Sequence, residues 1–112
     1  MTILLNKSDI QDFQNDGVVI LRGVFNEWID ILTKGAEHHI GNPSESALIH
    51  KGGNYEGKFL EDFCNWRRIP EYSDFVLNSP LASIAADLME STSVQFFHDH
   101  FFYKEALSGT PT

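Results

Sequence analysis

The sequence has a single cysteine, few basic residues and no long hydrophobic run, and each shortage excludes a class of protein. With Cys64 alone no internal disulfide can form, and the default location of such a chain is the cytoplasm. The 8 Lys and Arg residues are outnumbered by 16 Asp and Glu residues, and no basic stripe suited to nucleic acid is present. The net charge of −8 also disfavours an anionic membrane surface. No apolar run approaches the ~18 residues that a membrane-spanning helix needs.

The chain of 112 residues has room for one domain, and a hydrophobic fraction of 42% is typical of a globular protein. We therefore treat residues 1–112 as a single domain. Apolar spacing and helix start and stop signals predict helices over residues 8–15, 26–40, 70–77 and 80–89. Apolar and aromatic runs predict extended segments at residues 18–21, 59–66 and 94–104, and a long loop fills residues 42–57. This mixture predicts the α+β class.

Two local signals near the N-terminus carry specific expectations. Ser8 followed by Gln11 matches a capping box, which predicts that Ser8 caps the first helix. Val18–Leu21 is a β-branched run between two glycines, which predicts a short buried strand.

The run from Val94 to Lys104 is the strongest strand signal in the chain, and a loop rich in turn residues, Ser108–Thr112, follows it. Such a loop normally leads into another strand. We therefore expect the chain to be the N-terminal part of a longer protein, with a natural C-terminus at Thr112 as the alternative. An unpaired strand edge at residues 94–104 would favour self-association.

The most conspicuous polar cluster is His98-Asp99-His100, within this predicted strand. Strand alternation places one set of side chains on one face: His98, His100, Phe102 and Lys104. Two imidazoles on one face can ligate a metal, but a site needs three or four ligands and no second paired group is evident. Histidines that line a cavity are the favoured interpretation. A small protein that binds its own metal through His98 and His100 stays open as a further hypothesis.

Several segments together resemble the N-terminal half of the phytanoyl-CoA dioxygenase family. They are Asp16–Phe25, Trp66-Arg67-Arg68, Asn78–Ala82 with Ala85–Met89, and Phe97–Glu105, and the similarity spans about Asp9 to Thr112. The family belongs to the oxygenases that depend on Fe(II) and 2-oxoglutarate. The resemblance implies the N-terminal helices and first strands of a double-stranded β-helix, or jelly-roll, fold.

In that family, a strand like the one at residues 94–104 is followed by a Trp-His-x-Asp motif. The His and Asp of that motif, with a distal His, hold the iron, and a later Arg holds the 2-oxoglutarate carboxylate. No His-x-Asp pair occurs in these 112 residues. We therefore expect no metal ligand, no bound cofactor and no activity from this chain alone. The positions that the resemblance carries over are His98, His100, Phe102 and Lys104, as the lining of the cosubstrate and substrate cavity.

Two functions from different classes follow. The first is a non-haem Fe(II), 2-oxoglutarate-dependent dioxygenase that hydroxylates a small organic substrate in the cytoplasm. The second is a non-catalytic acidic fragment or interaction module that retains the outer part of the fold. For both we expect neither nucleic acid nor membrane as a partner.

Overall fold

The computed structural model describes residues 5–51 and 57–106 of the chain. The first elements are α1 (Lys7–Asp16), the 3₁₀ helix η1 (Asn26–Trp28), α2 (Ile29–Gly41) and β1 (Leu48–Lys51). They are followed by β2 (Lys58–Phe63), α3 (Pro70–Asn78), α4 (Leu81–Leu88) and β3 (His100–Lys104). The mixture of helices with one small sheet confirms the α+β class. Within the described ranges, none of the helices combines the length and the apolar character needed to cross a bilayer.

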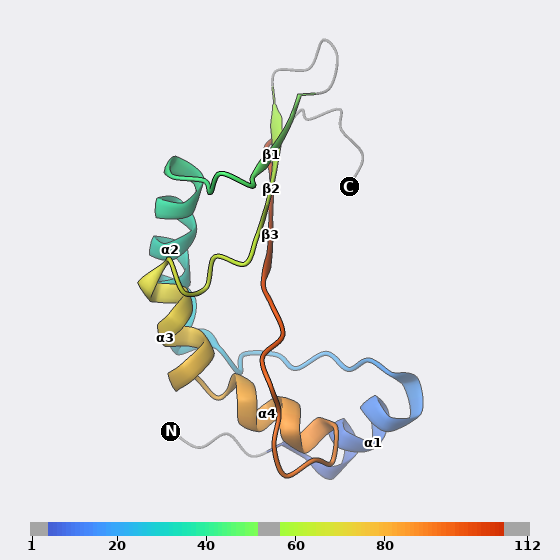
Figure 1. Ribbon diagram of the computed structural model, residues 1–112. Helices are drawn as coiled ribbons and strands as arrows, with labels where there is room; N and C mark the ends of the chain where they lie inside the picture. The colour runs from blue at the N-terminus through green and yellow to red at the C-terminus, as the bar shows by residue number, and fades with distance from the viewer. Residues whose placement is uncertain (1–4, 52–56, 107–112) are drawn as a thin grey trace.

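The three strands form one antiparallel sheet in the order β1-β2-β3. In its register, Glu61 of β2 lies opposite Leu48 of β1 and Phe102 of β3. Figure 1 shows α2 and α3 along one side of the sheet, while α1 and α4 lie together at the other end of the molecule. The radius of gyration, 16.5 Å, exceeds the roughly 13 Å of a compact domain of this length. The molecule is therefore elongated, and one side of its sheet has no helix against it in the part of the chain that is described.

Leu60 of β2 and Ile69, at the start of α3, are buried where the sheet meets the helices, and Ile84 is the buried residue of α4. Pro70 begins α3, and its ring suits a first helical turn because the N–H that it lacks has no partner there. Gly35 of α2 lets α3 approach closely, since a Cβ at this position would lie 2.9 Å from Cε1 of Tyr72.

The predicted buried strand at Val18–Leu21 is wrong. These residues belong to no strand, and Val18 is 65% and Ile20 72% exposed. A β-branched run favours extended backbone, but a strand also needs a neighbour to accept its hydrogen bonds. Within the described residues, the three-stranded sheet does not include this segment.

The first helix forms as predicted, but its cap is not Ser8. Asn6 occupies the cap position, and its backbone N–H donates to the Asp9 carboxylate at 3.2 Å. The sequence contains two overlapping capping patterns, and the one that begins at Asn6 lies two residues earlier than the one that begins at Ser8.

The predicted strand at residues 94–104 is shorter than expected, because β3 begins only at His100. Just before β3, the Asp99 carboxylate accepts hydrogen bonds from the backbone N–H groups of Asn65 and Trp66 at 3.0 and 2.9 Å. These bonds tie residue 99 to the turn after β2.

The predicted loop at residues 42–57 contains β1. Its residues 52–56 and the predicted loop Ser108–Thr112 lie outside the described residues.

Candidate functional site

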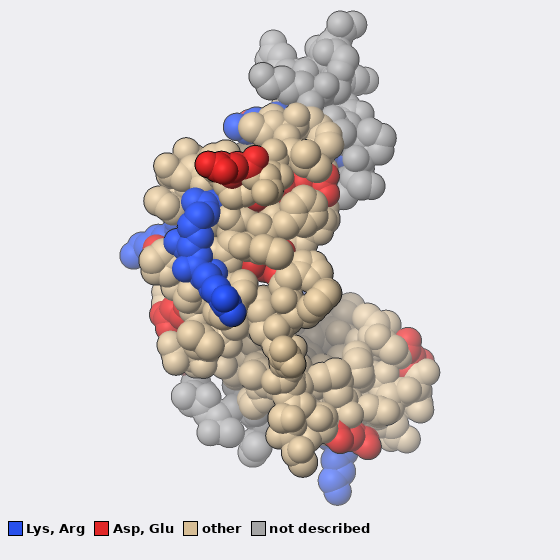
Figure 2. All heavy atoms as spheres, viewed as in Figure 1, with Lys and Arg blue, Asp and Glu red and all other residues tan. Residues whose placement is uncertain are grey.

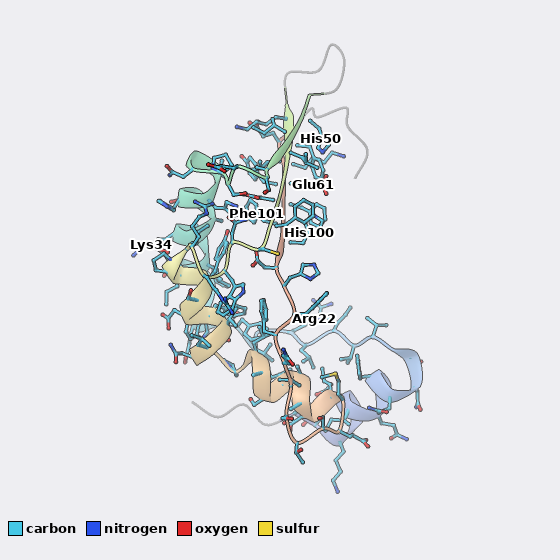
Figure 3. The ribbon with its side chains drawn as sticks, in the orientation of Figure 1. Arg22, Lys34, His50, Glu61, His100 and Phe101 are labelled. Carbon is cyan, nitrogen blue, oxygen red and sulfur yellow. The ribbon has the colours of Figure 1, made fainter. Side chains whose placement is uncertain are left out.

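The side of the sheet that faces away from α2 and α3 is called here the open face. Alternation along the strands places every second side chain on it. The open face consists of Leu48 and His50 from β1, Phe59, Glu61 and Phe63 from β2, and His100, Phe102 and Lys104 from β3. Figure 3 shows His50, Glu61 and His100 on this side of the sheet and Phe101 on the side of the helices.

Glu61 sits at the centre of the open face, between two histidines. The Nε2 atom of His50 lies 2.9 Å from Oε2 of Glu61, and the Nε2 atom of His100 lies 3.1 Å from Oε1. Each histidine thus uses a different carboxylate oxygen. The two contacts join all three strands through side chains, in addition to the backbone ladder.

Aromatic rings surround this carboxylate in a continuous series across the strands. His50 stacks on Phe59 with ring centroids 5.5 Å apart, and Phe59 stacks on Phe102 at 5.9 Å. His100 lies between Phe102 at 3.9 Å and Phe63 at 4.1 Å. Phe102 is still 52% exposed, so part of the series forms apolar surface on the open face.

The residues predicted as cavity lining are only partly brought together. His100 and Phe102 are adjacent on the open face, and Lys104 is an exposed residue of the same face at the end of β3. His98 precedes β3. The strand alternation that predicted it on the same face as His100 therefore does not apply to it. His98 instead borders the apolar pocket described below, and its role as lining of the cosubstrate cavity stays a prediction.

Sequence reasoning missed both His50 and Glu61. His50 fell within a segment interpreted as loop, and Glu61 stood alone among aromatic residues. The alternation of Phe59, Glu61 and Phe63 was the available signal, because it places a carboxylate between aromatic residues on one strand face. Only the register of the sheet connects that carboxylate with histidines 11 and 39 residues away in the chain.

On the helix side of the sheet lies an apolar pocket of about 450 Å³. Its walls come from α2, α3, α4 and the segment that leads into β3, and His98 borders it together with Phe96 and Phe101. The surface is also hollowed between the part that carries the sheet and the part that carries α1 (Figure 2), but α1 contributes no residue to this pocket. A pocket of this size and lining suits the apolar part of a small molecule.

A buried polar network connects α2, α3 and β2 behind the open face. Nε2 of His39 lies 2.8 Å from Oδ2 of Asp62, and both side chains are fully buried. Nδ1 of His39 lies 3.0 Å from the hydroxyl of Tyr72. Because the carboxylate can only accept, neutral His39 donates its Nε2–H to Asp62 and accepts a hydrogen bond from the Tyr72 hydroxyl at Nδ1.

The network stabilises one protonation state. Burial by itself would raise the pKa of Asp62, but hydrogen bonds from the Ser44 hydroxyl and backbone N–H and from His39 outweigh it, and the pKa lies well below 3.8. Burial, together with the charge of Asp99, raises the pKa of Tyr72 to about 12. Asp62 is therefore ionised and Tyr72 protonated at neutral pH. Because His39 and Asp62 are fully buried and both ring nitrogens and both carboxylate oxygens have partners, the network joins the layers rather than acting on a ligand.

The iron implied by the family resemblance does not fit the residues at hand. Among residues 5–51 and 57–106, no group of three or more His, Cys, Asp or Glu side chains is arranged to hold a metal ion. The histidines beside Glu61 direct N–H groups at the carboxylate, whereas a metal requires lone pairs that converge on one point.

Comparison with known proteins gives no relative: no family model, no curated protein and no solved structure matches this chain.

Proposed function

We propose that this chain forms the first part of a jelly-roll oxygenase that depends on Fe(II) and 2-oxoglutarate and hydroxylates a small organic substrate in the cytoplasm. The resemblance of residues 97–105 and the three earlier segments to the phytanoyl-CoA dioxygenase family is the basis of the proposal. The observation that supports it is the open face, where two histidines lie beside the exposed ring of Phe102 on the side of the sheet that, in the described part of the chain, has no helix against it.

In this proposal the chain supplies binding surface rather than metal ligands. Its described residues do not form an iron site, and no step of the oxidation is assigned to them. His100 and Phe102 contact the ligand from β3, and Lys104 contributes a positive charge suited to a carboxylate. The iron ligands would come from a His-x-Asp motif that these 112 residues do not contain.

The experiment begins with the reading frame after the codon for Thr112. A Trp-His-x-Asp motif within about ten codons, as the family spacing implies, supports the oxygenase, and the protein that includes it should form succinate from 2-oxoglutarate. In that protein, replacing His98 or His100 by alanine should reduce activity or cosubstrate affinity roughly ten- to hundredfold. Iron content should stay near one per chain. Iron lost in step with activity would make these residues ligands and reject the assignment.

The second candidate is the non-catalytic interaction module. The exposed apolar residues Leu48 and Phe102 on the open face favour it, because such surface is commonly covered by a partner. A stop codon directly after Thr112, combined with stable association of the purified chain, supports this candidate over the oxygenase.

A further inference from the structure

The arrangement around Glu61 constrains which nitrogen of each neighbouring histidine carries the proton. We propose that Glu61 is a positioning residue that holds His50 and His100 in the Nε2–H tautomer. Each imidazole then offers its Nδ1 lone pair to a ligand, and the open face takes ligands that carry N–H or O–H donors. The ligand class rests on the proposed role of the open face as a cavity wall, whereas the tautomers do not.

The first step is the hydrogen-bond chemistry. An ionised carboxylate accepts hydrogen bonds and cannot donate them. The contacts of 2.9 Å from His50 and 3.1 Å from His100 therefore place a hydrogen on both Nε2 atoms. A neutral imidazole has one N–H, so the remaining nitrogen, Nδ1, carries the lone pair in each ring.

The second step is that the rings are held while part of each remains accessible. Phe59 packs against His50, and Phe63 and Phe102 pack against His100, which restricts rotation of both imidazoles. The His50 side chain is still 36% exposed and that of His100 30% exposed. In the described part of the chain, hydrogen bonds to these two rings involve only their Nε2 atoms.

The third step concerns the ligand. Two oriented acceptors select for a donor group, such as an ammonium, a hydroxyl or an amide N–H. In each ring Nδ1 points away from the carboxylate that Nε2 contacts, so the two acceptors are separate and each takes one donor. An ammonium N–H is a simple probe of such an acceptor.

The tautomers are tested by ¹⁵N NMR of the imidazole rings at pH 8, above the ordinary histidine pKa of about 6.5. Both histidines should show a protonated Nε2 and an unprotonated Nδ1. The informative variant is Glu61→Gln, whose amide replaces one acceptor by an N–H₂ donor. One of the two histidines should then switch to the Nδ1–H tautomer, so that its Nε2 can accept. An unchanged pair of tautomers in this variant would overturn the proposal.

Two controls separate positioning from stability. Glu105→Gln alters a carboxylate that, among the described residues, accepts a hydrogen bond from the backbone N–H of Lys58 and contacts neither histidine, and it should leave both tautomers unchanged. Should Glu61→Gln fail to fold, Glu61→Asp serves instead: its shorter side chain should release both rings into a mixture of tautomers, as expected for a solvent-exposed imidazole. Fixed tautomers in Glu61→Asp would likewise reject the role of Glu61.

The ligand class is tested with two small cations that differ in their donors. Ethylammonium, which has N–H groups, should shift the Nδ1 signals of His50 and His100, and Glu61→Gln should weaken this binding roughly fivefold. Tetramethylammonium has the charge but no N–H, and it should leave the signals in place. Equal shifts with both cations, or none with either, would reject the ligand class. These outcomes do not depend on iron or succinate, so the oxygenase proposal can fail while the tautomer assignment holds.

Discussion

His39 and Asp62 form a fully buried pair in which Nε2 of the imidazole lies 2.8 Å from the carboxylate. The pair connects α2 to the middle strand of the sheet, directly behind Glu61. Since side chains alternate along β2, Asp62 faces the helices and Glu61 the open face. The buried pair therefore positions the strand on which the candidate site is built.

Removal of His39 should destabilise the protein strongly. His39→Ala leaves the Asp62 carboxylate buried without one of its partners and leaves the Tyr72 hydroxyl without its acceptor, so we expect a loss of about 3 kcal/mol in the free energy of unfolding. Urea denaturation measures it. His38→Ala, at the exposed neighbouring position of α2, is the control and should change stability by less than about 0.5 kcal/mol. Similar losses in the two variants would contradict the role of the buried pair.

The stability of the protein should depend on Asp62 in acid. Its pKa in the folded state lies below the value of 3.8 that an unperturbed Asp has, so the unfolded state binds more protons as the pH falls below about 4. The free energy that Asp62 contributes is therefore present above pH 4 and is lost progressively in more acidic solution. Unfolding measured from pH 2 to pH 6 tests this.

The matched variants for that pH profile are Asp62→Asn and Asp12→Asn. The first should lower stability at neutral pH and flatten the acid part of the profile, because the titrating group is gone. Asp12 is an exposed residue of α1, and its variant should keep the wild-type slope. An Asp62→Asn profile parallel to the wild type would show that other carboxylates cause the acid loss.

Gly35 should not tolerate a methyl group. In Gly35→Ala the new Cβ would meet Cε1 of Tyr72 at 2.9 Å and Cβ of Glu71 at 3.0 Å, so α2 and α3 must move apart at a cost of about 1–3 kcal/mol. This exceeds the gain of about 1 kcal/mol that alanine brings to a helix. At Gly41 a Cβ meets nothing within 4 Å. Thermal unfolding should therefore show a lower Tm for Gly35→Ala and an unchanged or higher Tm for Gly41→Ala.

Self-association should depend on the exposed apolar surface of β3. Phe102 belongs to an edge strand of the described sheet and is 52% exposed, and edge strands with apolar surface tend to pair with another chain. Phe102→Lys should reduce the associated fraction in sedimentation velocity runs across a wide concentration range. Ile20→Lys, which changes an exposed apolar residue outside the sheet, should have less effect. Equal reductions would point to general apolar contacts rather than to β3.

The 112-residue chain by itself should not turn over 2-oxoglutarate. The sequence has no His-x-Asp pair, and the described residues have no group of three metal ligands. The measurement is succinate formation with added Fe(II) and ascorbate, with and without a chelator. Iron-dependent succinate formation that the chelator removes would overturn this prediction.

The sequence by itself determined the helices and the central strand β2, because apolar spacing, Pro70 and the aromatic run after Lys58 act over a few residues. It also determined the face on which Phe102 lies relative to His100, since alternation is a local property of a strand. The length of β3 was not determined locally. β3 begins directly after Asp99, whose carboxylate accepts hydrogen bonds from the amides of Asn65 and Trp66, which are distant in the chain.

Only the tertiary structure decided the candidate site and the fate of the Val18–Leu21 run. Glu61 meets His50 and His100 because two strand pairings set one register, and register depends on burial of a whole face rather than on any single residue. The β-branched run shows the converse, because its composition favours a strand but no pairing within the described residues includes it. Local propensity selects a backbone conformation, whereas a sheet position and a site require partners that the chain brings together only on folding.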